Sequence, residues 1–105
     1  MIRAGLTSIG LLNAQGNLFI LGALSENIIC DEPYNVAVSC IVDFSFSGNG
    51  CLYTVTSSGE AFVVNGAKKG IKIYKLDTMR DIKEVHNGLD FTVFVDSKNK
   101  CYGLG

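Results

Sequence analysis

One pattern recurs three times along the 105-residue chain, and this repeat limits the folds open to it. Each copy has a turn residue that tolerates positive φ, an aromatic residue three positions later and a glycine eleven positions earlier. Such regular spacing is hard to obtain by chance, even in a chain with 12 glycines. The repeat positions are Gly5, Gly16, Phe19 and Gly22, then Gly48, Gly59, Phe62 and Gly66, then Gly88, Asn99, Tyr102 and Gly105.

Each copy is predicted to be a β-hairpin. Before the turn residue the chain reads LTSIGLLN, GCLYTVTS or DFTVFVDS, where β-branched and aromatic residues partly alternate with polar ones. The turns AQGN, SSGE and SKNK are polar and short, and LFILG, AFVVNG and CYGLG follow as returning strands. The second copy has one extra residue near Val64–Asn65, for which we expect a β-bulge.

The segments between hairpins have room for two more strands each. Lys72–Leu76 is predicted as an outer strand, and Ile41–Phe46 and Ile82–Val85 as strands that lead into the next copy. Four short strands in about 40–45 residues are typical of a propeller blade. We therefore predict an all-β fold, a partial β-propeller of about three repeated antiparallel hairpin units. The chain forms one repeat domain, 1–105, with cores at about 1–24, 41–67 and 82–105 and outer-strand linkers at 25–40 and 68–81.

The repeat also explains the apolar stretch near the start of the chain. A signal peptide needs about 7–15 uninterrupted apolar residues, and polar residues such as Thr7, Asn13 and Asn17 divide residues 1–24. The run from Leu18 to Leu24 is much shorter than the ~20 residues that span a bilayer. Because the same pattern returns twice downstream, we interpret it as the first returning strand, made apolar by stacking.

Composition gives no support to several classes of function. Nine Lys and Arg against ten Asp and Glu leave a net charge of −1, so nothing favours nucleic acid or an anionic membrane as a partner. Cys30, Cys40, Cys51 and Cys101 form no C-x-x-C pair, and the only histidine is His86. We interpret the cysteines as free buried thiols in an intracellular, cytoplasmic or nuclear, protein. A disulfide such as Cys30–Cys40 and a metal site are the alternatives.

The repeat resembles that of the regulator of chromosome condensation family. That repeat has a glycine, an alternating strand, a turn glycine, an aromatic residue and then Trp-Gly. The resemblance covers essentially the whole chain, although Leu21, Asn65 and Leu104 stand where the family has Trp. It implies a seven-bladed propeller of about 350–400 residues. The chain would then supply only part of a ring, with apolar end faces to be covered by further blades, a partner subunit or self-association.

Motifs for chemistry are weak. His86 with Glu84 and Asp90 lacks the spacing of a catalytic triad, and we expect a polar loop there. GNGCLY, from Gly48, lacks the third glycine and the helix of a dinucleotide site, and NGAKKG, from Asn65, is not a phosphate-binding loop. We expect no enzyme, no cofactor and no metal site.

The predicted function is a non-enzymatic protein–protein interaction module. Residues 25–35, SENIICDEPYN, read as a protruding loop, in which Asp31 and Tyr34 are candidate partner contacts. Lys68 and Lys69 are further candidates, while Lys68, Lys69, Lys72 and Lys75 together would keep an outer strand soluble. Two alternatives remain: an exchange or regulatory factor for a small GTPase, which the resemblance alone implies, and a structural subunit of a large complex.

Overall fold

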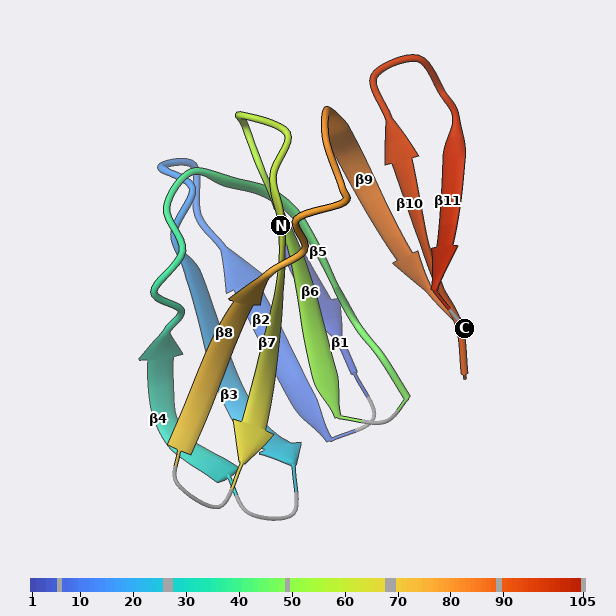
Figure 1. Ribbon diagram of the computed structural model, residues 1–105. Helices are drawn as coiled ribbons and strands as arrows, with labels where there is room; N and C mark the ends of the chain where they lie inside the picture. The colour runs from blue at the N-terminus through green and yellow to red at the C-terminus, as the bar shows by residue number, and fades with distance from the viewer. Residues whose placement is uncertain (6, 26–27, 49, 68–69, 89, 105) are drawn as a thin grey trace.

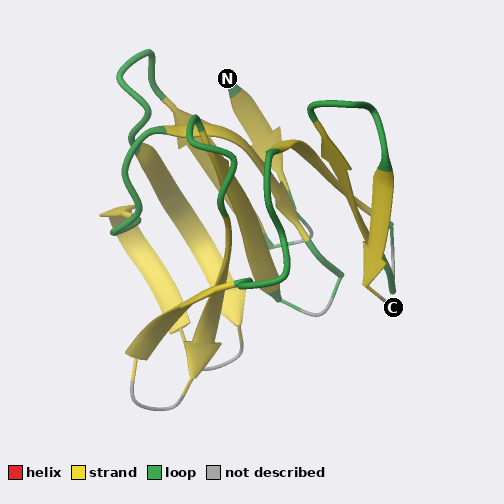
Figure 2. Ribbon diagram, turned by 45° about the horizontal axis from the view of Figure 1, so that its top comes forward, coloured by secondary structure: helices red, strands yellow, loops and turns green. Residues whose placement is uncertain are grey.

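The computed structural model describes residues 1–5, 7–25, 28–48, 50–67, 70–88 and 90–104, and this part is all-β (Figures 1 and 2). Its strands, in chain order, are β1 (Ile2–Ala4), β2 (Ser8–Leu12), β3 (Leu18–Ser25), β4 (Ile28–Asn35), β5 (Ile41–Phe46), β6 (Cys51–Thr56), β7 (Ala61–Ala67), β8 (Gly70–Lys75), β9 (Ile82–Asn87), β10 (Thr92–Asp96) and β11 (Cys101–Leu104).

These strands form three antiparallel sheets, and within each sheet the strands that are consecutive in the chain pair with each other. The first sheet has the order β1-β2-β3-β4, the middle sheet β5-β6-β7-β8 and the third sheet β9-β10-β11. Each sheet therefore contains one copy of the sequence repeat. The all-β class and the three antiparallel hairpin units are confirmed.

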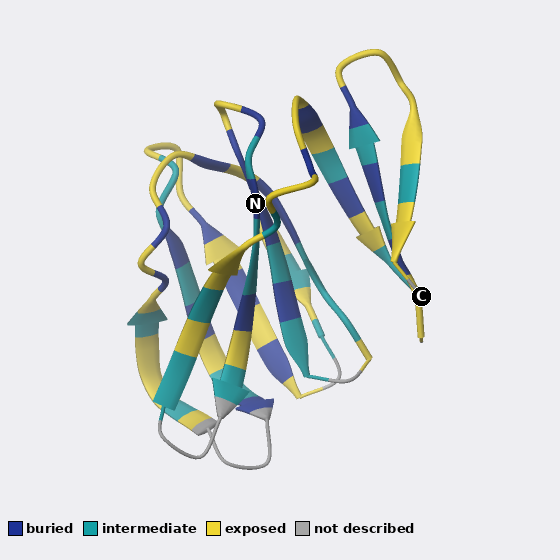
Figure 3. Cartoon of the chain, in the orientation of Figure 1, coloured by how far each residue is buried: buried dark blue, intermediate teal, exposed yellow. Residues whose placement is uncertain are grey.

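The middle sheet lies between the other two (Figure 1). Side chains of β6 point alternately to the two neighbours, so Leu52 joins the core shared with the first sheet and Val55 joins the core shared with the third. The first core also holds Leu18, Ile20 and Phe44, and the second holds Val85 and Phe94, all fully buried (Figure 3). Burial on both faces explains why the middle sheet is apolar on both faces.

The same backbone contacts join each sheet to the next at the hairpin turns. The carbonyl of Gly16 accepts a hydrogen bond from the Ile41 N–H at 3.0 Å, and the carbonyl of Gly59 accepts one from the Ile82 N–H at 3.0 Å. We call this contact the inter-sheet clasp. In each clasp the carbonyl of a turn glycine accepts a hydrogen bond from the first residue of the next sheet.

Each turn is also closed by a polar side chain three residues before the turn residue. Asn13 Oδ1 accepts from the Gln15 and Asn17 N–H groups, and Thr56 Oγ1 accepts from the Glu60 N–H. In the third turn, Asp96 Oδ1 accepts from the Lys98 and Lys100 N–H groups at 2.9 Å each. Such side chains satisfy backbone donors that a tight turn leaves without strand partners. The Asn, Thr and Asp at this spacing were a signal that the repeat analysis missed.

Sequence spacing predicts a glycine at the start of each repeat copy, but that glycine makes the same backbone hydrogen bond in only two of the three copies. The Gly5 and Gly88 N–H groups donate to the carbonyl three residues on, at 2.7 and 2.9 Å. In the second copy Ser47 has this place, donating to the Cys51 carbonyl at 2.8 Å, and Gly48 follows it in a longer loop. Loop length, which sequence spacing does not reveal, accounts for the difference.

Two expectations about local structure are wrong. Residues 28–35 are not a protruding loop but strand β4, an outer strand on which Pro33 costs no hydrogen bond toward a further strand. The expected bulge near Val64–Asn65 does not occur either, because β6 and β7 pair without a register shift from Cys51 to Asn65. The extra residue lengthens the hairpin toward its open end instead.

Two side-chain expectations are also wrong. His86 lies in strand β9, not in a loop, with an exposed side chain. The four cysteines are free thiols, but they are not core residues: Cys40 and Cys101 are exposed, and Cys30 and Cys51 are half-buried.

The predicted outer strand at Lys72–Leu76 is confirmed as β8, which begins two residues earlier and ends one residue earlier than predicted.

Candidate interaction surfaces

The predicted contact residues do not form one site. Tyr34 is half-buried and packs against the core between the first two sheets, so its ring stabilises the fold. It also lines a hollow of about 410 Å³ with Ile71 of β8, to which the exposed Asp31 does not contribute. Lys68 and Lys69 lie outside the described residues, as does Gly105.

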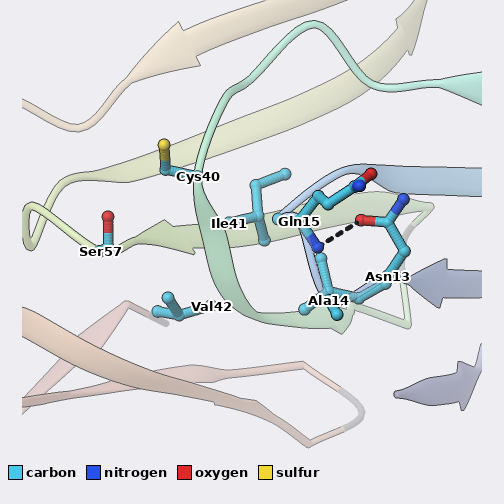
Figure 4. Close-up of a pocket in the computed structure, with 9 residues that line it drawn as sticks. Asn13, Ala14, Gln15, Cys40, Ile41, Val42 and Ser57 are labelled. Carbon is cyan, nitrogen blue, oxygen red and sulfur yellow. Dashed lines mark hydrogen bonds between the residues drawn. The ribbon is translucent and has the colours of Figure 1, made fainter.

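The hairpin turns lie together at one end of the molecule (Figure 1). A hollow of about 390 Å³ lies between the first turn and β5, lined by Asn13, Gln15, Cys40, Val42 and Ser57 among others (Figure 4). The lining holds no charged side chain and combines polar groups, such as Asn13 and Gln15, with apolar ones, such as Ile41 and Val42. A charged hollow of about 570 Å³ follows beside the second turn, where Lys75 Nζ lies 2.6 Å from Glu60 Oε2. The hydrogen bond between them lowers the pKa of Glu60 and raises that of Lys75.

Groups suited to catalysis do not converge in the described residues. His86 Nε2 lies 3.2 Å from Glu84 Oε1, but both side chains are about half exposed, so water competes for the pair. Burial raises the pKa of the Cys51 thiol and of the Cys30 thiol, which keeps both in the poorly nucleophilic protonated form. Three metal-ligating side chains do not gather anywhere in the described segments. Also within them, no helix is long and apolar enough to cross a membrane.

A single buried carboxylate connects all three sheets. Asp43 of β5 is 5% exposed, and its Oδ1 lies 2.6 Å from Arg3 Nη1 of the first sheet. Its Oδ2 accepts a hydrogen bond from the Val85 N–H of the third sheet at 2.9 Å. Arg3 also donates to the Phe44 carbonyl and lies 5.7 Å from the centre of the Phe44 ring. The sequence signal was an acidic residue inside the apolar run IVDFSF, which sequence analysis did not single out.

The first sheet has an apolar face that no described residue covers. Cross-strand pairing places Ile2, Leu11 and Phe19 in one row and Ile9 and Leu21 in the next, all on the side away from the middle sheet. Ile2 is 71% exposed, Ile9 44% and Leu11 38%. We call these five residues the first end face. Apolar side chains gathered on an uncovered face in this way make it a candidate surface for contact with another molecule.

The opposite end of the array has a different face. Val93 and Val95 of β10 point away from the middle sheet and are half-buried, with the exposed Cys101 beside Val95 on β11. Glu84 and His86 of β9 pair with Val95 and Val93 and complete this second end face.

The repeat relates each end face to an interface inside the molecule. Leu11 of the first end face lies five residues before its turn residue, as do Thr54 and Phe94, which are fully buried by the preceding sheet. Val95 of the second end face lies four residues before its turn residue, as do Leu12 and Val55, which are buried by the following sheet. The two end faces are therefore the two halves of the interface that occurs twice within the chain.

Comparison with known proteins gave no matching family model and no similar curated protein.

Proposed function

We propose that the chain is a non-enzymatic protein–protein interaction module built from propeller repeats, and that it binds through its end faces. The observation that carries this proposal is the first end face, where Ile2, Ile9 and Leu11 are exposed although their counterparts in the other sheets are buried. The propeller itself is part of the proposal. Chain-order sheets, stacking of one repeat on the next and the repeated inter-sheet clasp support it.

A structural subunit of a large complex would use the same faces, so the two interpretations share their support. The exchange-factor alternative rests on the family resemblance alone, and none of the contacts described above favours it. The free thiols support a reducing, intracellular compartment for the module.

Site-specific photo-crosslinking tests the proposal. A photoreactive phenylalanine analogue at Leu11 lies in the first end face, while the same analogue at Tyr74, 52% exposed on β8, is the matched control outside both end faces. In cells that express the chain, we expect protein adducts from position 11 and few from position 74. Equal yields at the two positions, or none at position 11, would show that the face binds no protein.

A further inference from the structure

We propose that the two end faces bind each other across two copies of this chain, so that two copies form a closed, twofold-symmetric dimer of six sheets. This inference rests on the proposed function, because it names the partner of the first end face as the second end face of another copy.

The internal interfaces show what covers an end face. Between the middle and third sheets, Val55 and Phe94 belong to one buried core. Val55 corresponds to Val95 and Phe94 to Leu11, as counted from the turn residues. Stacking the first end face of one copy on the second end face of another therefore places Leu11 against Val95, in an arrangement that the chain already forms twice.

A charged group on the second end face fits the same arrangement. Glu84 pairs with Val95 as Asp43 pairs with Val55, so the two carboxylates hold the same position in their sheets. Asp43 accepts a hydrogen bond from the Val85 N–H. The counterpart of Val85 in the first sheet is Ile2, because Val85 pairs with Phe94 and Ile2 pairs with Leu11, each five residues before its turn residue. In the dimer Glu84 accepts the Ile2 N–H of the other copy, which gives this half-exposed carboxylate a partner besides His86.

The number of sheets favours two copies. Stacking one end face on the opposite end face continues the array in one direction, and repetition then produces either a ring or a fibre. Propellers hold about four to eight blades, and two copies of three sheets supply six, whereas three copies would supply nine. Two copies therefore close within the known range.

Analytical ultracentrifugation of the 105-residue chain and of three variants tests this. We expect about twice the 11.3 kDa chain mass for the wild type. Leu11→Lys and Val95→Glu, one on each end face, should each raise the dimer dissociation constant at least about 30-fold, because each buries an unpaired charge. Tyr74→Lys, outside both faces, should leave it within about twofold.

Mixing the two face variants gives the decisive result. A mixed dimer has one interface between two wild-type faces and one in which the two introduced side chains, of opposite charge, lie against each other. Leu11→Lys and Val95→Glu chains should therefore pair 1:1 although each alone is monomeric. Circular dichroism and the urea midpoint of each variant check that it remains folded. A monomeric wild type, a species that grows beyond two copies, a dimeric Val95→Glu variant or a mixture that stays monomeric would each overturn the dimer.

The outcome separates the two proposals. If the chain is monomeric but position 11 still crosslinks to other proteins, the dimer is wrong and the interaction module stands. If position 11 crosslinks to nothing and the chain is monomeric, both are wrong.

Discussion

The middle and third repeats hold corresponding residues in different surroundings. Asp43 in the middle repeat is buried between two sheets, whereas the side chain of Glu84, its counterpart in the third, is 46% exposed and has His86 as its one polar partner among the described residues. Gly59 carries the clasp to the third sheet, whereas Asn99, its counterpart, has no described residue of a further sheet against it. Which residue type can occupy a repeat position thus depends on whether a neighbouring sheet packs against that position.

The turn residues show this most clearly. Gly16, Gly59 and Asn99 all have positive φ, of 82°, 84° and 65°, a region that Asn enters more easily than most side chains. A Cβ on Gly59 would lie 2.7 Å from the Asp81 Cα, and one on Gly16 would lie 2.9 Å from the Cys40 Cα. Turn conformation alone permits Gly or Asn, and the close approach of the next sheet selects Gly.

Removing the two corresponding carboxylates should give the largest difference. Asp43→Ala leaves the Val85 N–H unpaired and the Arg3 guanidinium without its counter-ion, at a cost of about 3 kcal/mol in the free energy of unfolding. Glu84→Ala in the isolated monomer should stay within about 0.5 kcal/mol. Urea denaturation below the dimer dissociation constant measures both. Equal losses would mean that coverage by the third sheet does not matter at this position.

The turn residues should give the next largest difference. Gly59→Ala adds a strained left-handed alanine and a contact with the Asp81 backbone, so we expect a loss of about 3 kcal/mol. Asn99→Ala adds conformational strain and removes the exposed hydrogen bond that Asn99 Oδ1 accepts from Lys83 Nζ, about 1 kcal/mol together. Asn99→Gly removes the same hydrogen bond without the strain and should cost about 0.5 kcal/mol or less. Thermal unfolding ranks the three variants. If Asn99→Ala were as unstable as Gly59→Ala, a neighbouring segment would have to pack as closely against the third turn as the Asp81 backbone packs against the second.

The smallest expected difference is in the pH dependence of stability, and it compares the first turn, closed by Asn13, with the third turn, closed by Asp96. Hydrogen bonds from the Lys100 backbone above all, and from Tyr102, hold the pKa of Asp96 below its ordinary value of 3.8. Because this pKa is lower in the folded chain than in the unfolded one, the carboxylate stabilises the fold above pH 3.8. That contribution disappears as the pH falls through the lowered pKa.

Asp96→Asn should remove this part of the acid dependence while keeping the turn, since Asn13 closes the first turn with the same oxygen. Unfolding midpoints between about pH 2 and 6 measure the change, and Ser97→Ala is a control in the same turn. An unchanged acid profile in Asp96→Asn would mean that other carboxylates cause it.

Local patterns predicted most of the fold. Alternation and turn chemistry located the hairpins, and Ile41–Phe46 was predicted with the bounds that β5 has. An outer strand was expected within 25–40 but was not located, because Asp31, Glu32 and Pro33 have low strand propensity and made residues 25–35 resemble a loop. The pairing of β4 with β3, which runs through two irregularities, overrides that preference.

The candidate surfaces were less predictable, since they depend on contacts between repeats. The apolar character of residues 18–22 was correctly attributed to stacking, but only cross-strand pairing shows that Phe19 and Leu21 face outward and Leu18 and Ile20 inward. Asp43 was missed for the same reason. An isolated acid in a strand reads as a solvent-facing residue until Arg3 and Val85, about 40 residues away on either side, are placed beside it.

The outer strands decide which kind of assembly is open to the chain. Pro33 has no N–H to offer, and the neighbouring Asp31 and Glu32 are charged and exposed, while Lys72 and Lys75 are exposed along β8. Such edges resist the addition of strands from other chains, which is the first step toward cross-β fibrils. The first and middle sheets can therefore associate through their faces while their charged outer strands, β4 and β8, oppose the edge-to-edge pairing that leads to amyloid.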